Sequence, residues 1–344
     1  MLHFESDYMA GAHPEVLQRL IETNLEQTVG YGADEYTARA RALIREACGA
    51  PEARVHFLVG GTQTNATVID GLLARHEGVL AAESGHISVH EAGAIEASGH
   101  KVLTLPQHEG KVRAEDVARY IDDFYRDETY EHMVAPGMLY ISFPTEYGTL
   151  YSLAELEALS QVCHKAKIPL YIDGARLGYA LGAEGCDVTL RDIARLADLF
   201  YIGGTKVGAL FGEAVVVTNP SLLPHFFPLV KQHGALLAKG RLLGVQFEAL
   251  FSDGLYERIG RKATSLALRL KEGFERLGYR SVVDSPTNQQ FFLLPNEVVD
   301  RLKPHAGFEY WGPRGEREST VRFVTSWNTT DNDITALLQL LEQK

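Results

Sequence analysis

Short runs of apolar residues alternate with longer amphipathic segments through about the first three quarters of the chain. The runs are nearly continuous in apolar residues, which is typical of strands that are covered by helices on both faces. The expected strands are 54–59, 78–83, 101–105, 138–143, 168–173 and 199–204, and the expected helices are 14–26, 34–48, 64–76, 90–98 and 114–125. This alternation predicts an α/β fold with a large, doubly wound, mostly parallel sheet. The segment 213–218 is a candidate antiparallel strand of that sheet.

The rhythm changes near Ser252–Gly254, where a long helix over 255–277 is expected to begin. After it we expect few strands and a final helix, at 279–284, 290–294, 321–326 and 331–342. This pattern favours a small α+β domain. The predicted organisation is therefore an N-terminal arm and helix (1–30), a large domain (31–252) and a small C-terminal domain (253–344).

Composition narrows the class of protein. The 344 residues suffice for one large and one smaller domain, with 45% apolar and 23% charged residues. A formal net charge of -12 disfavours nucleic acid and anionic membranes as partners. The three cysteines form no CxxC pair, so neither a disulfide framework nor a cysteine zinc site is expected. Without a signal peptide or an apolar run long enough to span a membrane, a cytoplasmic protein with reduced thiols is expected.

Three polar features follow expected strands, and ligands of open α/β sheets gather at the carboxyl ends of strands. The first is the segment Gly60–Asn65, which opens a helix. It is either a turn with a helix cap or a phosphate site, because glycines and free N–H groups at a helix start accommodate an anion. It lacks the G-x-G-x-x-G pattern, and Gly203–Lys206 lacks the spacing of a nucleotide-binding P-loop.

The other two features are Asp173 and Lys206. Asp173 ends an apolar strand, so it either caps or pairs locally with Arg176, or it faces a cationic ring nitrogen. Lys206 lies between Tyr-Ile-Gly-Gly-Thr and Val-Gly-Ala-Leu-Phe-Gly, so we expect apolar surroundings that lower its pKa and make it nucleophilic. Otherwise it is a solvated surface lysine.

One ligand would use all three features. Pyridoxal 5'-phosphate has a phosphate for Gly61 and Thr62, a pyridine nitrogen for Asp173 and an aldehyde for Lys206. The order and placement of these residues therefore predict an amino-acid-processing enzyme in which Lys206 holds the cofactor as a Schiff base.

Several motifs resemble the L-threonine aldolase / aromatic amino acid β-eliminating lyase family, which has the aspartate-aminotransferase-like fold type I. The matching segments are Phe4–Asp7, Tyr31–Gly32, Gly61–Thr62, His86–Ile87, Asp173–Leu177 and Val321–Thr325. The chain departs from many members at Pro144-Thr145-Glu146, where they have Asn-Thr-His, and at Thr205–Ala209. These forms look more like the low-specificity bacterial branch.

The resemblance implies roles for individual residues. His86 would stack on the cofactor ring, and either His86 or Glu146, through a water, would be the base. Arg322 would bind the substrate carboxylate with help from Ser6, and Arg176 would join them or bind the phenolic oxygen of the cofactor. His86 and His90 lack a third ligand, so no metal is expected.

The resemblance also implies a homo-oligomer, a dimer or tetramer, with the active site at a dimer interface. Tyr31 would come from the neighbouring subunit. Arg241 would either reach the partner's phosphate or be a solvated helix residue.

The activity expected from this likeness is cleavage of L-threonine, L-allo-threonine or a related β-hydroxy-α-amino acid to glycine and an aldehyde. One alternative is β-elimination or exchange of another amino acid's side chain. Two alternatives of other classes are a nucleotide-binding hydrolase with Gly60–Thr64 as its phosphate loop and a non-catalytic protein that keeps the fold.

Overall fold

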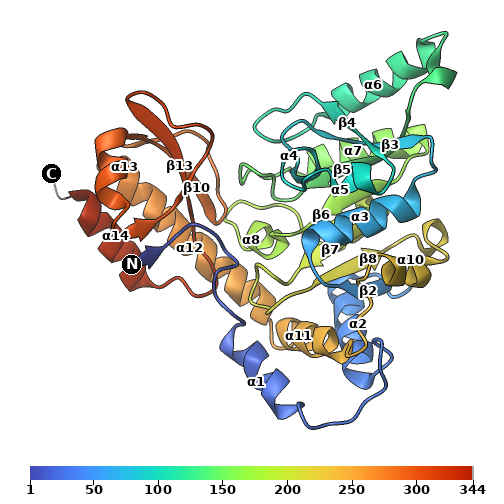
Figure 1. Cartoon of the computed structure of the whole chain (residues 1–344), viewed down its shortest axis with the longest axis horizontal. Helices are drawn as coiled ribbons and strands as arrows, with labels where there is room; N and C mark the ends of the chain where they lie inside the picture. The colour runs from blue at the N-terminus through green and yellow to red at the C-terminus, as the bar shows by residue number, and fades with distance from the viewer. Residues whose placement is uncertain (343–344) are drawn as a thin grey trace.

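The computed structural model describes residues 1–342, which form a large domain and a small domain side by side (Figure 1). The strands are β1 (Leu2–His3), β2 (Arg54–Leu58), β3 (Glu77–Ala82), β4 (Lys101–Leu105), β5 (Ala135–Ser142), β6 (Leu170–Asp173), β7 (Leu199–Gly203), β8 (Glu213–Val217), β9 (Arg280–Ser281), β10 (Gln289–Pro295), β11 (Ala306–Gly307), β12 (Glu309–Tyr310) and β13 (Glu318–Val324). The helices are α1 (Pro14–Glu22), α2 (Glu35–Cys48), α3 (Gly61–Leu72), α4 (His86–Val89), α5 (Ala94–Ala97), α6 (Ala114–Arg126), α7 (Leu153–Ala166), α8 (Leu177–Leu181), α9 (Leu190–Leu196), α10 (Phe226–Gln232), α11 (Arg241–Phe251), α12 (Leu255–Arg276), α13 (Asn296–Leu302) and α14 (Asp331–Glu342).

The large domain is built on a seven-stranded sheet in the order β2-β8-β7-β6-β5-β3-β4. All neighbours are parallel except β8, which is antiparallel to both β2 and β7, as the sequence predicts for this segment. Apolar side chains of α3, α5 and α10 cover one face of the sheet. Those of α2, α6, α7, α9 and α11 cover the other. Burial on both faces explains why the strands are apolar almost throughout.

Local sequence explains where individual helices begin. Asp34 caps α2 by accepting the N–H of Thr37 at 2.8 Å, and Ser152 and Glu155 form a reciprocal capping box at the start of α7. The prediction of one helix over 90–98 is wrong. Ala92 and Gly93 have φ angles of 51° and 73°, in the left-handed region, and they separate α4 from α5.

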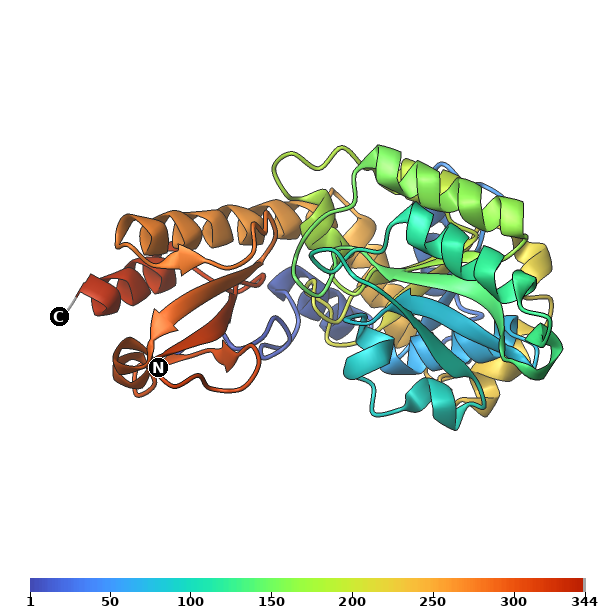
Figure 2. The ribbon, with the colours of Figure 1, turned by 90° about the horizontal axis from the view of Figure 1, so that it is seen from above.

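The small domain has a four-stranded antiparallel sheet, in the order β12-β13-β10-β9, packed against α12, α13 and α14. The N-terminal arm joins it: β1 pairs with β11, and Phe4 is buried in the small-domain core. Figure 2 shows the long helix α12 running from the small domain to the large one, and α12 contacts both α14 and α8. None of the helices within residues 1–342 is long and apolar enough to cross a membrane.

Candidate active site

A cavity of about 240 Å³ lies at the carboxyl ends of β5, β6 and β7, beside the start of α3. The predicted site residues that line it are Gly61, Thr62, His86, Glu146, Asp173, Arg176 and Lys206. The parallel order of the strands brings these residues together from distant parts of the sequence, as expected for an open α/β sheet.

Lys206 lies in the loop between β7 and β8 and is buried in this cavity. Burial and the positive charge of Arg176 lower the pKa of its ammonium group, which favours the nucleophilic amine. The expectation of apolar surroundings is wrong. The cavity walls near the lysine are polar or charged, with Glu146, Asp173 and Glu213 among them.

Asp173 is the last residue of β6, and its carboxylate accepts three hydrogen bonds. Tyr140 Oη and Asn65 Nδ2 donate to Oδ2 at 2.6 and 2.9 Å, and the N–H of Ala175 donates to Oδ1 at 3.0 Å. Burial alone would raise the pKa of Asp173, but the nearby His86 and these donors hold it below its ordinary value. The local pair with Arg176 is not formed, so a buried carboxylate faces the cavity.

His86 is the first residue of α4, and its Nδ1 lies 2.7 Å from Oε1 of Glu91. Burial lowers the pKa of His86, but the hydrogen bond to Glu91 and the charges of Glu146 and Asp173 raise it above its ordinary value. A carboxylate that orients an imidazole and increases its basicity is typical of histidines that exchange protons. The side chain of Glu91 is fully buried, so this pair is fixed from the protein interior.

Glu146 lies in the loop after β5, where its Oε1 accepts a hydrogen bond from Ser142 at 3.2 Å. The same loop contacts the small domain, because Ser285 and Thr287 donate to the carbonyl of Gly148 at 3.2 and 3.1 Å. Glu146 therefore reaches the cavity from a loop whose position depends on both domains.

Arg176 pairs with a residue of the N-terminal arm. Its Nε and Nη2 donate to Oδ2 and Oδ1 of Asp7 at 2.7 and 3.1 Å, and Asn288 Nδ2 of the small domain donates to Oδ2 at 2.9 Å. Burial raises the pKa of Asp7, but the Arg176 guanidinium outweighs it and the pKa lies below its ordinary value. This bidentate pair fixes Arg176 against the cavity and joins the arm to both domains.

Arg322 lies on β13, outside the residues that line the cavity. Its guanidinium donates to Gln289 Oε1 at 2.8 Å and to Glu309, and it stacks on Trp311 at 5.2 Å. Within residues 1–342, Arg322 Nε and Ser6 Oγ are buried and have no hydrogen-bond partner. Two unsatisfied donors of this kind fit an anionic ligand that would enter between the arm and the small domain.

Tyr31 and Arg241 lie away from the cavity in this chain. Tyr31 is about half exposed, and Lys231 Nζ lies 5.1 Å from its ring. Arg241, the first residue of α11, donates to the carbonyls of Glu26 and Asn24 at 2.8 and 3.1 Å. Within one chain, Arg241 therefore anchors the loop after α1.

Sequence reasoning missed several residues of the site. The structure adds Tyr8, Tyr201, Thr205 and Glu213 to the cavity wall. A Cβ on Gly61 would lie 3.2 Å from Tyr201 Oη, so the glycine leaves room for the tyrosine at the start of α3. Of these residues, Glu213 could have been predicted from the sequence, because it is a charged residue at the start of the apolar strand 213–217. Burial raises its pKa to about 8.

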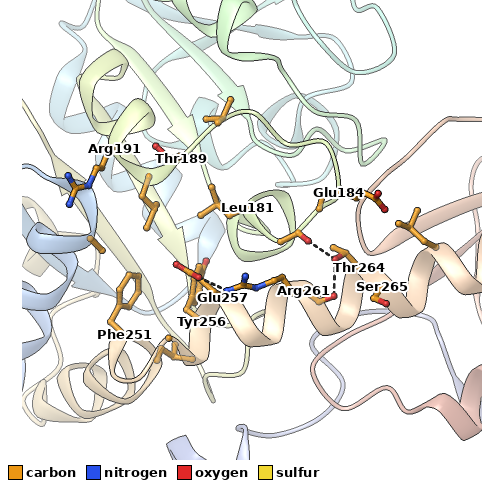
Figure 3. A pocket seen from close by; sticks show the side chains of 18 of the residues that line it. Leu181, Glu184, Thr189, Arg191, Phe251, Tyr256, Glu257, Arg261, Thr264 and Ser265 are labelled. Carbon is orange, nitrogen blue, oxygen red and sulfur yellow. Dashed lines mark hydrogen bonds and ion pairs between the residues drawn. The ribbon is translucent and has the colours of Figure 1, made fainter.

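A larger hollow of about 920 Å³ runs along α12 beside α8 and α9 (Figure 3). None of the predicted site residues lines it. Arg261 there is paired with Glu257 one turn earlier on α12, at 2.7 Å, and Thr264 donates to the carbonyl of Gly182 at 2.9 Å. Arg261 and Thr264 are thus engaged in contacts within the chain at the domain junction.

Known proteins resemble this chain over nearly its whole length. The family model "Beta-eliminating lyase" matches residues 3–297. A low specificity L-threonine aldolase of Pseudomonas aeruginosa is 29% identical over 332 residues, which cover 95% of this chain and 93% of the relative. The solved structure of Leishmania major threonine aldolase has 42% identity and a TM-score of 0.97, covering 100% of this chain and 99% of that one.

More distant structures share the fold. An aspartate aminotransferase of Thermus thermophilus, 15% identical, has a TM-score of 0.71 and covers 99% of this chain and 90% of its own. The predicted aspartate-aminotransferase-like fold is confirmed, and so is the family that the motifs resemble. By its match to the family model and its likeness to the Leishmania structure, this chain belongs to the β-eliminating lyase and threonine aldolase family.

Proposed function

We propose that this protein cleaves L-threonine, L-allo-threonine or a related β-hydroxy-α-amino acid to glycine and an aldehyde. The observation that carries the proposal is that Lys206, Asp173 and the start of α3 line one cavity of about 240 Å³. Two relatives that cover 95% of this chain bear the name of low specificity L-threonine aldolase, which supports the same reaction.

Pyridoxal phosphate is the cofactor indicated by the family and by the residues present. The first turn of α3 has N–H groups for its phosphate, Asp173 has a buried acceptor for its pyridine nitrogen, and Lys206 has an amine for its aldehyde. When bound, the cofactor withdraws electrons from Cα of the substrate. The chain's own residues must then fix the substrate and move its protons.

Arg322 and Ser6 would bind the carboxylate of the amino acid. Their unpaired, buried Nε and Oγ atoms support this assignment. Arg176, held by Asp7, presents a fixed positive charge at the cavity wall and would complete the carboxylate site or bind the phenolic oxygen of the cofactor. Fixing the carboxylate selects which bond at Cα breaks, because it sets the rotation of the substrate.

His86 is the group that we assign to the proton of the β-hydroxyl. Its contact with Glu91 supports this role because the carboxylate strengthens the base. His86 accepts the hydroxyl proton, the Cα–Cβ bond breaks, the aldehyde leaves, and a proton returned to Cα completes glycine. Glu146, acting through a water, is the alternative. His86→Asn and Glu146→Gln separate the two, because loss of the base removes the rise of rate with pH.

The proposed assembly is a homo-oligomer whose active site lies at a dimer interface. The surface around α1 supports it, because neighbouring side chains there are large, apolar and exposed. They are Leu17, Ile21, Leu25, Val29 and Tyr31. Light scattering of the wild type and of Ile21→Glu tests this assembly, since a buried charge would disrupt the contact. The free thiols of the chain suit the expected cytoplasmic location.

The test of the activity is incubation of the protein and pyridoxal phosphate with L-threonine and, separately, with L-allo-threonine. Equal amounts of glycine and acetaldehyde are the expected products. Formation of a 2-oxo acid and ammonia instead would overturn the aldolase and identify the β-eliminating alternative.

A further inference from the structure

Asn65 lies between two buried carboxylates of the site. It is fully buried in the second turn of α3. Its Nδ2 donates to Oδ2 of Asp173 at 2.9 Å and to Oε1 of Glu91 at 2.7 Å. Its Oδ1 accepts the hydroxyl of Tyr171 at 2.9 Å. The amide therefore uses both N–H groups on carboxylates and has its own oxygen satisfied.

Two buried carboxyl groups that share one nitrogen as their donor require a neutral group with two N–H bonds. Like charges at short range favour protonation of one partner, and each carboxylate in a dry interior needs donors to stay ionised. Glu91 has few other donors: Oε1 contacts His86, and within residues 1–342 its Oε2 has no partner. An uncharged amide with two N–H groups satisfies both carboxylates without adding a charge.

We propose that Asn65 is a positioning residue that joins Asp173 to the His86–Glu91 pair, so that the group facing the cofactor ring nitrogen and the group moving the proton are held as one hydrogen-bonded unit. The proposal rests on the function proposed above. In this proposal α3 positions both carboxylates, because Asn65 donates to each of them and follows Gly61 by one helical turn. One helix then sets the phosphate site with its first turn and the two acids with its second.

The charged and titratable groups around Asn65 come from several elements. They are Tyr140 of β5, Tyr171 and Asp173 of β6, Tyr201 of β7, His86 of α4, Glu91 and Glu146 of loops, and Lys206 after β7. Removing the amide takes one donor from each carboxylate and leaves the other groups in place. The pKa of Asp173 then rises, and the cluster becomes less stable while Asp173 is ionised.

The test uses the cofactor-free protein, so that it does not depend on cleavage of threonine. Asn65→Leu keeps the volume and removes the donors, Asn65→Ser keeps one donor, and Asn65→Asp adds a third carboxylate. Thr67→Val is the matched control, because Thr67 is equally buried on α3 and its hydroxyl binds only the carbonyl of Gln63, at 2.7 Å. The melting temperature of each variant is measured at pH 7.5 and at pH 3.

Asn65→Leu is expected to lower the melting temperature by about 5 °C more at pH 7.5 than at pH 3, because the pKa of Asp173 lies below its ordinary value and the lost donor matters only while this carboxylate is ionised. Asn65→Asp should show a larger difference and Asn65→Ser a smaller one. Thr67→Val should lower the melting temperature by the same amount at both pH values. Equal losses at both pH values for Asn65→Leu and Asn65→Ser would show a merely structural role and overturn the proposal.

A second measurement uses pyridoxal phosphate. The affinity for the cofactor is measured by its absorbance. It is expected to fall about tenfold in Asn65→Leu and by a smaller factor in Asn65→Ser. With threonine as substrate, kcat should fall while KM stays near the wild-type value, since Arg322 and Ser6 are untouched. Unchanged cofactor affinity and an unchanged kcat would contradict the proposal. If the wild type failed to cleave threonine, the stability and affinity results would still decide the role of Asn65.

Discussion

The proposed cofactor side of the site and its proposed substrate side differ in where their residues come from along the chain. Gly61 begins α3, Asp173 ends β6, and Lys206 lies in the loop after β7, so all three belong to the large domain. For the proposed substrate side, the arm supplies Ser6 and Asp7, and the small domain supplies Arg322 and Asn288.

This difference has consequences for what each side controls. The residues proposed for the cofactor, Gly61, Asp173 and Lys206, all belong to the large domain, so changes there should affect cofactor binding and kcat. The proposed substrate side includes contacts that join the arm to both domains. Changes there should affect KM and the stability of the domain contact.

The largest effect is expected from Lys206→Ala. Cleavage of threonine should fall by about 10⁴-fold or more, because no other lysine within residues 1–342 lines the cavity to hold the cofactor aldehyde. Steady-state assays and the absorbance of the loaded protein measure the loss. Lys101→Ala, at an exposed position on β4, is the control and should behave as the wild type. Retained cleavage in Lys206→Ala would break the assignment of the cofactor side.

Arg322→Leu should act through substrate binding. We expect KM for L-threonine to rise on the order of 100-fold, because a guanidinium–carboxylate contact is lost, with a smaller change in kcat. Initial rates over a range of threonine concentrations separate the two constants. An unchanged KM together with a reduced kcat would contradict the proposed contact of Arg322 with the substrate carboxylate.

Asp7→Asn tests whether the substrate side depends on the domain contact. Removing one partner of a buried ion pair leaves Arg176 without its counter-charge and should cost about 3 kcal/mol of unfolding free energy at pH 7. The pKa of Asp7 is depressed in the folded state, so its stabilisation is present above the unfolded pKa and is lost as pH falls through the folded value. Denaturant unfolding at pH 7 and pH 3 should therefore show a smaller cost at pH 3.

The control for this measurement is Asp331→Asn, which breaks the exposed pair with Arg269. Exposed pairs contribute little to stability, so only a small change is expected. If both variants behaved alike, the buried pair would have no special role in joining the arm to the domains.

Glu213→Gln should change the pH dependence of stability on the cofactor side. Burial raises the pKa of Glu213 to about 8, so its stabilisation is complete below the unfolded pKa and is lost as pH rises toward 8. A glutamine does not titrate. The stability of the variant relative to the wild type should therefore improve by about 2 kcal/mol between pH 5 and pH 8 in the cofactor-free protein. Parallel curves would show that Glu213 keeps an ordinary pKa.

The smallest effect is expected from Arg241→Ala. It removes two hydrogen bonds to the loop after α1, which should cost about 1 kcal/mol. Affinity for pyridoxal phosphate should be unchanged if Arg241 acts as an anchor. A large loss of affinity would instead favour contact with the phosphate of a partner subunit.

The difference between the two sides also explains what the sequence could predict. Asp173 and Lys206 each follow an apolar strand, and the carboxyl ends of parallel strands meet at one edge, so their convergence follows from local patterns. The antiparallel place of β8 and the start of α12 were predictable for similar reasons. The family motifs added His86, which no local pattern would have singled out.

Partnerships across long distances in sequence were not predictable. Arg176 is three residues from Asp173, yet it pairs with Asp7, 169 residues away. Asn65 stood in a recognised motif, but only the packing of α3 against β6 shows that its side chain contacts two acids. The break between α4 and α5 depends on left-handed backbone at Ala92, a conformation that sequence patterns rarely reveal.

The docking of the N-terminal arm sets an order of events during synthesis. The carbonyl of Phe4 accepts a hydrogen bond from the N–H of Val324, and its side chain packs in the small-domain core. Asp7 accepts a hydrogen bond from Asn288 of the small domain. The residues of the arm thus leave the ribosome long before Asn288 and Val324, with which they pair. A nascent chain can complete its central sheet early, but the contacts of the arm form only once the small domain has emerged.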